Sequence, residues 1–338
     1  MSKKNLILLI IVIAGVVIYL ATNKSLRTYS TENKAEYSKI FPKFDPESVD
    51  KIIIKKFMNT TTIEKRDSGW FVVDSGMTVR ADSGNVKSLL KDLGNIEILS
   101  LRSQSKKSHF KMKVDTLQGA RITLLSGKDT LCDIIIGGMS GFGLTYVRKP
   151  DSDNVYEAKG FLTRYSSITD WRDKTIVSVE PESVKSFSFR FPEGGYKLER
   201  TDSGWIATDL KSGETVRADS TKVIAVLRSL SHFMAPTFPK LPDDTAGIDF
   251  SKPDYEAKIL LNDGSEKNFA AYQTKKNDNV FVLKSSERKV LLRVYKGTMR
   301  RFERQSIDQF KSGADTPPSP PQVNVKSSGP VVVPKGKK

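Results

Sequence analysis

The chain has 338 residues and a formal net charge of +16, from 55 Lys and Arg against 39 Asp and Glu. This length allows one large domain or two ordinary ones. With a single cysteine, Cys132, and two histidines, the sequence excludes a disulfide framework and falls short of a Cys/His zinc site. His109 and His232 have no carboxylate nearby in the sequence, so we expect surface or capping roles for both.

The first segment is an uncharged apolar run from Leu6 to Ala21 that follows two lysines. About 20 helical residues span a bilayer, and the polar residues that flank the run can extend it. We therefore predict a cytoplasmic stub at residues 1–5 and a transmembrane signal-anchor at residues 6–22. The basic stub favours a cytoplasmic N-terminus in the inner membrane, which places the bulk of the chain in the periplasm.

Two alternatives stay open for this segment. A cleavable signal peptide has an apolar region of about 7–15 residues and a small-residue cleavage site, but here the bulky Tyr19 precedes Leu20 and Ala21. A buried helix of a soluble protein is the other alternative, although the run is apolar on every side. Residues 23–44 are polar and have no clear period, which is typical of a stalk.

An internal repeat organises the rest of the chain. PESVDKIIIKKF from Pro46 returns as PESVKSFSFRFP from Pro181, RDSGWFVVD returns as TDSGWIATD, and TVRADSGNVKSLLKDL returns as TVRADSTKVIAVLRSL. Three long blocks in one order and at nearly one spacing indicate a duplicated unit. We predict two similar units at residues 45–178 and 179–311, followed by a disordered Pro- and Lys-rich tail at residues 312–338.

Each copy opens with a β-hairpin pattern around a DSG turn. Asp67 and Asp202 are the turn residues, whose carboxylates are expected to accept hydrogen bonds from their own backbone. Trp70 and Trp205 follow the two turns and are predicted to be buried anchors of the repeat. Trp171 has only Phe302 as a counterpart in the second copy.

A helix pattern follows in each copy. Asp82 and Asp219 are the predicted N-caps, and Gly94 is the predicted C′ residue of the first helix. The pattern then returns to strands, and each copy ends in a short helix, near residues 161–166 and 297–302. The order of hairpin, helix, β-meander and helix predicts an α+β fold of mainly antiparallel sheet with short packing helices.

The glycine-rich stretch from Ile136 to Gly143 contains neither G-x-G-x-x-G nor GK[ST], and a strand pattern follows it. It therefore does not match a phosphate-binding loop. We predict a strand-to-strand loop here and take it as the candidate contact surface of the protein. The candidate contact residues are Gly138, Ser140, Gly141, Phe142 and Gly143.

The order of several short motifs resembles the bacterial DUF4340 family, a domain of unknown function. The resemblance covers roughly residues 46–310, and these motifs are W-F-V at 70–72, R-A-D at 80–82, V-x-x-L-L-x-x-L at 86–93, IIIGG at 134–138, TYVR at 145–148, V-Y at 155–156 and WRDK at 171–174. It implies a membrane-anchored envelope protein with repeated α+β units. Members often resemble auxiliary parts of gliding-type ABC transport systems, but this chain lacks their second hydrophobic segment near the C-terminus.

The resemblance brings no catalytic residues, and we predict no catalytic, cofactor-binding or metal-binding residues. The expected function is that of a non-enzymatic envelope scaffold that binds protein partners, as an accessory to a transport or surface-assembly complex. Nucleic acid is not an expected partner, because the basic residues are spread along the chain without a binding motif. The alternatives are a carbohydrate hydrolase with unidentified carboxylates and a spacer that binds anionic wall polymer or lipid through its basic surface.

Overall fold

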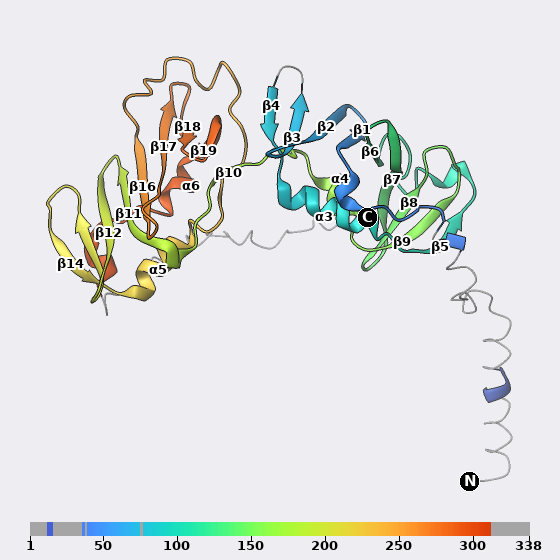
Figure 1. Ribbon diagram of the computed structural model, residues 1–338, viewed down its shortest axis with the longest axis horizontal. Coiled ribbons are helices and arrows are strands. Elements are labelled where there is room, and N and C mark those ends of the chain that lie inside the picture. Colours follow the sequence, from blue (N-terminus) through green and yellow to red (C-terminus); the bar gives the residue numbers. More distant parts are fainter. Residues whose placement is uncertain (1–11, 16–35, 38, 75–76, 312–338) are drawn as a thin grey trace, which may run out of the picture. The chain divides into compact units, whose positions relative to one another are not determined.

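The computed structural model describes residues 12–15, 36–37, 39–74 and 77–311. The predicted stub, most of the predicted signal-anchor and the predicted C-terminal tail lie outside these residues. Among the described residues, no helix is both long enough and apolar enough to cross a membrane. The chain divides into two compact units, unit 1 up to Asp173 and unit 2 from Lys174 onward, and each is built on one large antiparallel sheet (Figure 1).

The sheet of unit 1 has nine strands in the order β4-β3-β2-β1-β6-β7-β8-β9-β5. Its strands are β1 Lys51–Lys56, β2 Asn59–Arg66, β3 Gly69–Asp74, β4 Met77–Arg80, β5 Ile98–Ser103, β6 Ala120–Ser126, β7 Asp129–Gly141, β8 Leu144–Arg148 and β9 Val155–Lys159. Its helical segments are η1 Pro46–Ser48, α3 Ser83–Gly94, η2 Lys106–Ser108 and α4 Thr163–Ser167.

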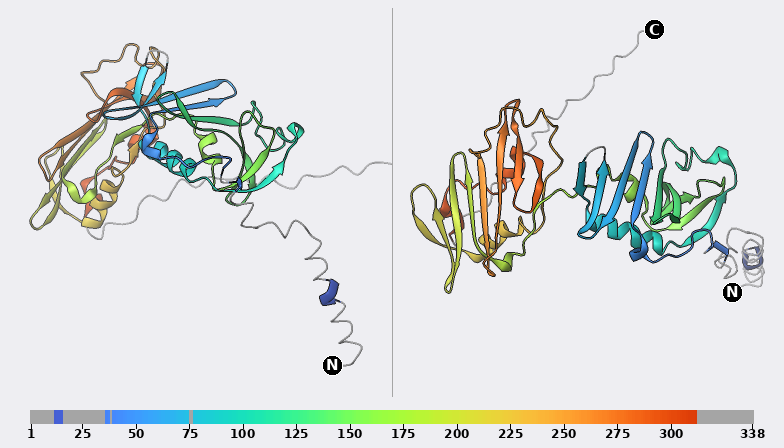
Figure 2. Two further views of the ribbon diagram at one scale, coloured as in Figure 1. Left: turned by 45° about the vertical axis from the view of Figure 1, so that its right-hand side comes forward. Right: turned by 45° about the horizontal axis from the view of Figure 1, so that its top comes forward.

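Helix α3 covers one face of this sheet (Figure 2). Asp82 caps the helix, because its carboxylate accepts a hydrogen bond from the Asn85 amide at 2.9 Å. The apolar residues spaced three and four apart lie on one side of the helix and are buried: Val86, Leu89, Leu90 and Leu93. They pack with the inward residues of the strands, such as Ile52 and Ile54 of β1, to form the core of unit 1.

Unit 2 contains an eight-stranded sheet in the order β14-β13-β12-β11-β16-β17-β18-β19, and a small sheet of β10 with β15. The strands are β10 Thr175–Val177, β11 Val184–Phe191, β12 Gly194–Thr201, β13 Gly204–Asp209, β14 Thr215–Ala218, β15 Phe233–Met234, β16 Tyr255–Leu261, β17 Glu266–Thr274, β18 Asn277–Ser285 and β19 Arg288–Tyr295. The helical segments are η3 Pro181–Ser183, α5 Ser220–Arg228, α6 Lys296–Arg300 and η4 Ile307–Phe310.

The two large sheets repeat one strand order, which agrees with the internal repeat in the sequence. Trp70 pairs with Lys65, and Trp205 pairs with Arg200, at equivalent positions of the two hairpins. Both tryptophans are buried, with exposed fractions of 8% and 5%. The units differ after the helix, because β5 of unit 1 joins the large sheet beside β9, whereas β15 of unit 2 pairs with β10.

Three boundaries differ from the sequence prediction. The two units divide between Asp173 and Lys174, not between residues 178 and 179. The end of the predicted stalk belongs to the fold, because Phe41 is buried in the core of unit 1 and Tyr37, Ile40 and Phe44 pack against that core. These four apolar residues are not evident in the sequence, because polar and charged residues surround them. Gly94 is the last residue of α3 rather than the C′ residue, and Asn95 follows it as the C-cap.

Candidate functional site: an aromatic hairpin tip

The glycine-rich stretch is mostly strand, so the predicted loop over residues 136–143 is wrong in extent. Strand β7 runs on to Gly141, and only Phe142 and Gly143 form the turn before β8. The glycine at position 137 is explained by packing and not by a loop. An added Cβ there would stand 2.4 Å from the Val114 side chain and 2.5 Å from the Met112 carbonyl oxygen. Gly137 therefore serves close packing against a neighbouring segment. Gly143 has φ +71°, which suits the tight turn.

Three apolar side chains are exposed at and beside this turn. Phe142 is 92% exposed, Met139 54% and Phe161 46%. The rings of Phe142 and Phe161 meet edge to face with their centroids 5.3 Å apart, a favourable geometry for an aromatic pair. We call these three side chains the aromatic tip. Of the predicted contact residues, Phe142 is the one with a large exposed side chain.

A buried threonine holds the two halves of the aromatic tip together. The Thr145 hydroxyl, which is fully buried, donates a hydrogen bond to the Gly160 carbonyl at 2.7 Å and accepts one from the Leu162 amide at 3.2 Å. The Gly160 amide in turn donates to the Gly143 carbonyl at 2.7 Å. Phe161 is thereby fixed beside the hairpin turn, so the aromatic tip is a preformed surface.

A long connection between β5 and β6, residues 104–119, packs against the strand that ends at the aromatic tip. We call it the lysine loop, because it carries four exposed lysines: Lys106, Lys107, Lys111 and Lys113. The Gly138 amide donates to the Met112 carbonyl at 2.9 Å, which joins the loop to β7. Val114 of the loop is fully buried against Ile135 and Val155 on the sheet. The loop also exposes Phe110 and Leu117.

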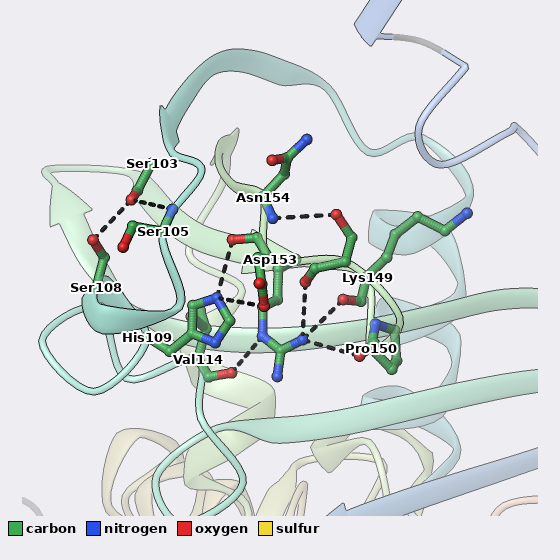
Figure 3. A network of polar contacts seen from close by, with 11 residues as sticks. Ser103, Ser105, Ser108, His109, Val114, Lys149, Pro150, Asp153 and Asn154 are labelled. Atoms are coloured by element: carbon green, nitrogen blue, oxygen red, sulfur yellow. Dashed lines mark hydrogen bonds and ion pairs between the residues drawn. The ribbon is translucent and has the colours of Figure 1, made fainter.

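His109 fixes the first half of the lysine loop (Figure 3). It is 5% exposed, which corrects the expected surface or capping role. Its Nε2 lies 3.0 Å from the main-chain oxygen of Asp153 and 3.9 Å from the Asp153 carboxylate. The ring is buried because the loop folds back over the β8–β9 connection, a long-range contact that the neighbours of His109 in the sequence do not reveal.

Arg148 fixes the second half of the loop and was not among the predicted residues. Only 7% exposed, it donates through Nε to the Val114 carbonyl at 2.8 Å. Its Nη1 donates to the carbonyls of the β8–β9 connection, at Lys149, Pro150 and Ser152 (Figure 3). Burial lowers the pKa of the guanidinium, an effect opposed by the charges of Asp153 and Asp115. Arg148 thus ties two loops together through main-chain acceptors.

The remaining predicted residues have structural environments. Asp219 caps α5 by accepting from the Thr221 amide at 2.8 Å, as Asp82 caps α3. Burial raises the pKa of the Cys132 thiol to about 12, so the group is protonated at neutral pH. His232 is exposed. Within the described residues, no group of three or more His, Cys, Asp and Glu side chains is arranged to hold a metal ion.

Carboxylates do gather in one pocket of unit 2. Asp249, Asp254 and Asp278 are among its lining residues, and its volume is about 510 Å³. The Asp249 carboxylate accepts hydrogen bonds from the hydroxyl and amide of Ser251, which lower its pKa. A glycosidase acid needs a raised carboxyl pKa, so the shift at Asp249 is in the wrong direction for that role.

The fold and the aromatic tip define a protein of two tandem antiparallel-sheet units with a preformed, exposed apolar surface. The chain belongs to the DUF4340 family, described as a domain of unknown function, whose model matches residues 70–253. This range starts at Trp70 and includes the lysine loop and the aromatic tip. No curated protein and no solved structure matches the chain.

Proposed function

We propose that the protein is a non-enzymatic scaffold of the bacterial envelope, anchored in the inner membrane by residues 6–22 with its N-terminus in the cytoplasm. The two sheet units would then lie in the periplasm and act by binding, as an accessory to a gliding-type ABC transport or surface-assembly complex. The apolar run, the duplicated units and the family resemblance support this proposal.

The aromatic tip is the observation that carries the binding role. Exposed Phe and Met side chains at and beside a turn lower solubility, so such a patch commonly marks a contact surface. Full burial of a Phe side chain in a contact is worth about 1.5–3 kcal/mol. Because Thr145 already fixes the main chain on both sides of Phe161, less conformational entropy would be lost when the aromatic tip is covered.

Fractionation of cells and gentle crosslinking test the two parts of this proposal separately. The full chain should remain with the membranes in high salt and enter solution only with detergent. Crosslinking in membranes, followed by mass measurement of the solubilised product, should give a complex of defined stoichiometry. Release by salt alone would argue for a cleaved segment and peripheral attachment, and a monomer after crosslinking would argue against a scaffold.

The lysine loop favours a second candidate function, a spacer held on an anionic surface. Its lysines project from a segment that His109 and Arg148 fix to the sheet. Attraction of such charges to an anionic polymer or lipid weakens as salt screens it. Binding of the full chain to isolated wall polymer that disappears on addition of salt would favour the spacer over the scaffold.

A further inference from the structure

We propose that the aromatic tip and the lysine loop together form a surface of unit 1 that rests on an anionic lipid bilayer. This inference deepens the proposed function and rests on its membrane anchor. The binding role that the aromatic tip carries would then be exercised on the bilayer, which would hold unit 1 at the membrane.

The apolar half of the surface has the shape and composition of an interfacial insertion. Phe142 stands at the end of a hairpin and is 92% exposed, so it projects from the fold instead of lining a groove. Phe161 and Met139 widen the apolar area around it. Aromatic and aliphatic side chains of this kind enter the boundary between headgroups and acyl chains when basic residues accompany them.

The basic half of the surface is supplied by the lysine loop. Lys113 lies close to the tip strand, because its side chain stands 3.4 Å from the position that a Cβ on Gly138 would take. The same loop also contains an acidic residue, Asp115. Its carboxylate is engaged within the loop, because it accepts hydrogen bonds from the Leu117 and Gln118 amides. Lysines beside an anionic leaflet are attracted to it within about one Debye length.

The path of the chain keeps this surface near the membrane that the anchor would enter. Tyr37 meets Tyr156 of β9 with ring centroids 6.2 Å apart, so the N-terminal segment joins unit 1 on a strand next to β8. Figure 1 shows residues 36–37 at the end of unit 1 that carries β5. The 14 residues between Thr22, the last residue of the proposed anchor, and Tyr37 can span at most about 50 Å. The bilayer that the anchor would enter is thus an anionic surface within reach of unit 1.

Depth-dependent quenching in vesicles tests the proposal on the full chain. Phe142→Cys and, as the matched control, Met58→Cys each receive an environment-sensitive maleimide dye; Met58 is 88% exposed on the β1–β2 turn of the same unit. Buried Cys132 stays in place, and the labelled parent measures its background. The proteins are reconstituted in phosphatidylcholine vesicles with or without phosphatidylglycerol, and with spin-labelled lipid as the quencher.

The proposal predicts strong quenching at position 142 and none above background at position 58, with the larger effect in phosphatidylglycerol. The double variant Lys111→Gln and Lys113→Gln should weaken the contact with the bilayer, measured as quenching at position 142, about fivefold per lysine removed. Equal quenching at both positions, or none at 142, overturns the proposal. Flotation of the same vesicles reports the anchor independently, because a chain that fails to float contradicts the proposed function itself.

Discussion

The main-chain amide of Asp82 donates a hydrogen bond to the carbonyl of Trp171 at 2.8 Å. The same relationship recurs in unit 2, where the Asp219 amide donates to the Phe310 carbonyl at 2.8 Å. Each helix cap is thus held by an aromatic residue from the end of its own unit, and both aromatic side chains are buried, at 2% and 0% exposure. In this contact the counterpart of Trp171 is Phe310, not Phe302 as the sequence suggested.

The two repeated tryptophans give the first prediction. Trp70→Ala and Trp205→Ala should each lower the free energy of unfolding by about 3–5 kcal/mol, because each removes a large buried ring and leaves a cavity. Chemical denaturation of the full chain measures the loss, with Met58→Ala as the exposed control. If both variants unfold like the parent but lose a binding partner, the rings are ligand platforms and not core anchors.

Arg148 gives a second prediction, about the loops of unit 1. Arg148→Ala should cost about 2–3 kcal/mol, because the carbonyls of Val114 and of the β8–β9 connection lose a charged donor. Arg190→Ala is the control, since its pair with Glu256 is exposed and should be worth less than about 1 kcal/mol. Hydrogen exchange should quicken in residues 104–119 of the Arg148 variant, and unchanged exchange there would contradict the bracing role.

The close approach at Gly137 can be tested by adding a single methyl group. Gly137→Ala should destabilise unit 1 by about 1–3 kcal/mol, because the new Cβ would overlap Val114 and the Met112 carbonyl. Gly297→Ala is the matched control, since an added Cβ there meets open space. Thermal unfolding measures both variants, and a Gly137→Ala protein as stable as the control would show that the lysine loop yields easily.

Cys132 gives a prediction about pH. Burial raises the pKa of its thiol from 9.0 to about 12, so alkylation of the folded protein should stay slow at pH 9 and become fast in denaturant. The unfolded chain releases the thiol proton at lower pH than the folded chain does. Stability should therefore fall as the pH rises above 9 towards 12, and Cys132→Ala should remove that part of the fall. Rapid alkylation of the native protein at pH 9 would contradict this environment.

The repeat, the antiparallel sheets and the helix caps could be predicted from the sequence, because each depends on local patterns. The DSG turns, the alternation after Trp70 and the three-and-four spacing after Asp82 all lie within short windows. The turn at Phe142 and Gly143 falls within the predicted loop, because a glycine-rich stretch is visible in the sequence.

The anchoring of the lysine loop could not be predicted, because it depends on contacts far apart in the sequence. Arg148 bonds to Val114 across 34 residues, and His109 to Asp153 across 44. Neither residue has a local pattern that marks it as buried. The extent of β7 could not be predicted for the same reason, since the close approach of the lysine loop that accounts for Gly137 is a long-range contact.

The burial of Phe41 determines how a mechanical load would enter the fold. A pull applied from the N-terminal side would have to extract this ring from the core of unit 1 before it could strain β1. Strand β1 lies inside the sheet and is hydrogen-bonded to β2 on one side and β6 on the other. A force on the tether would therefore be shared across the central strands of unit 1 and would not peel away a strand at the sheet's edge.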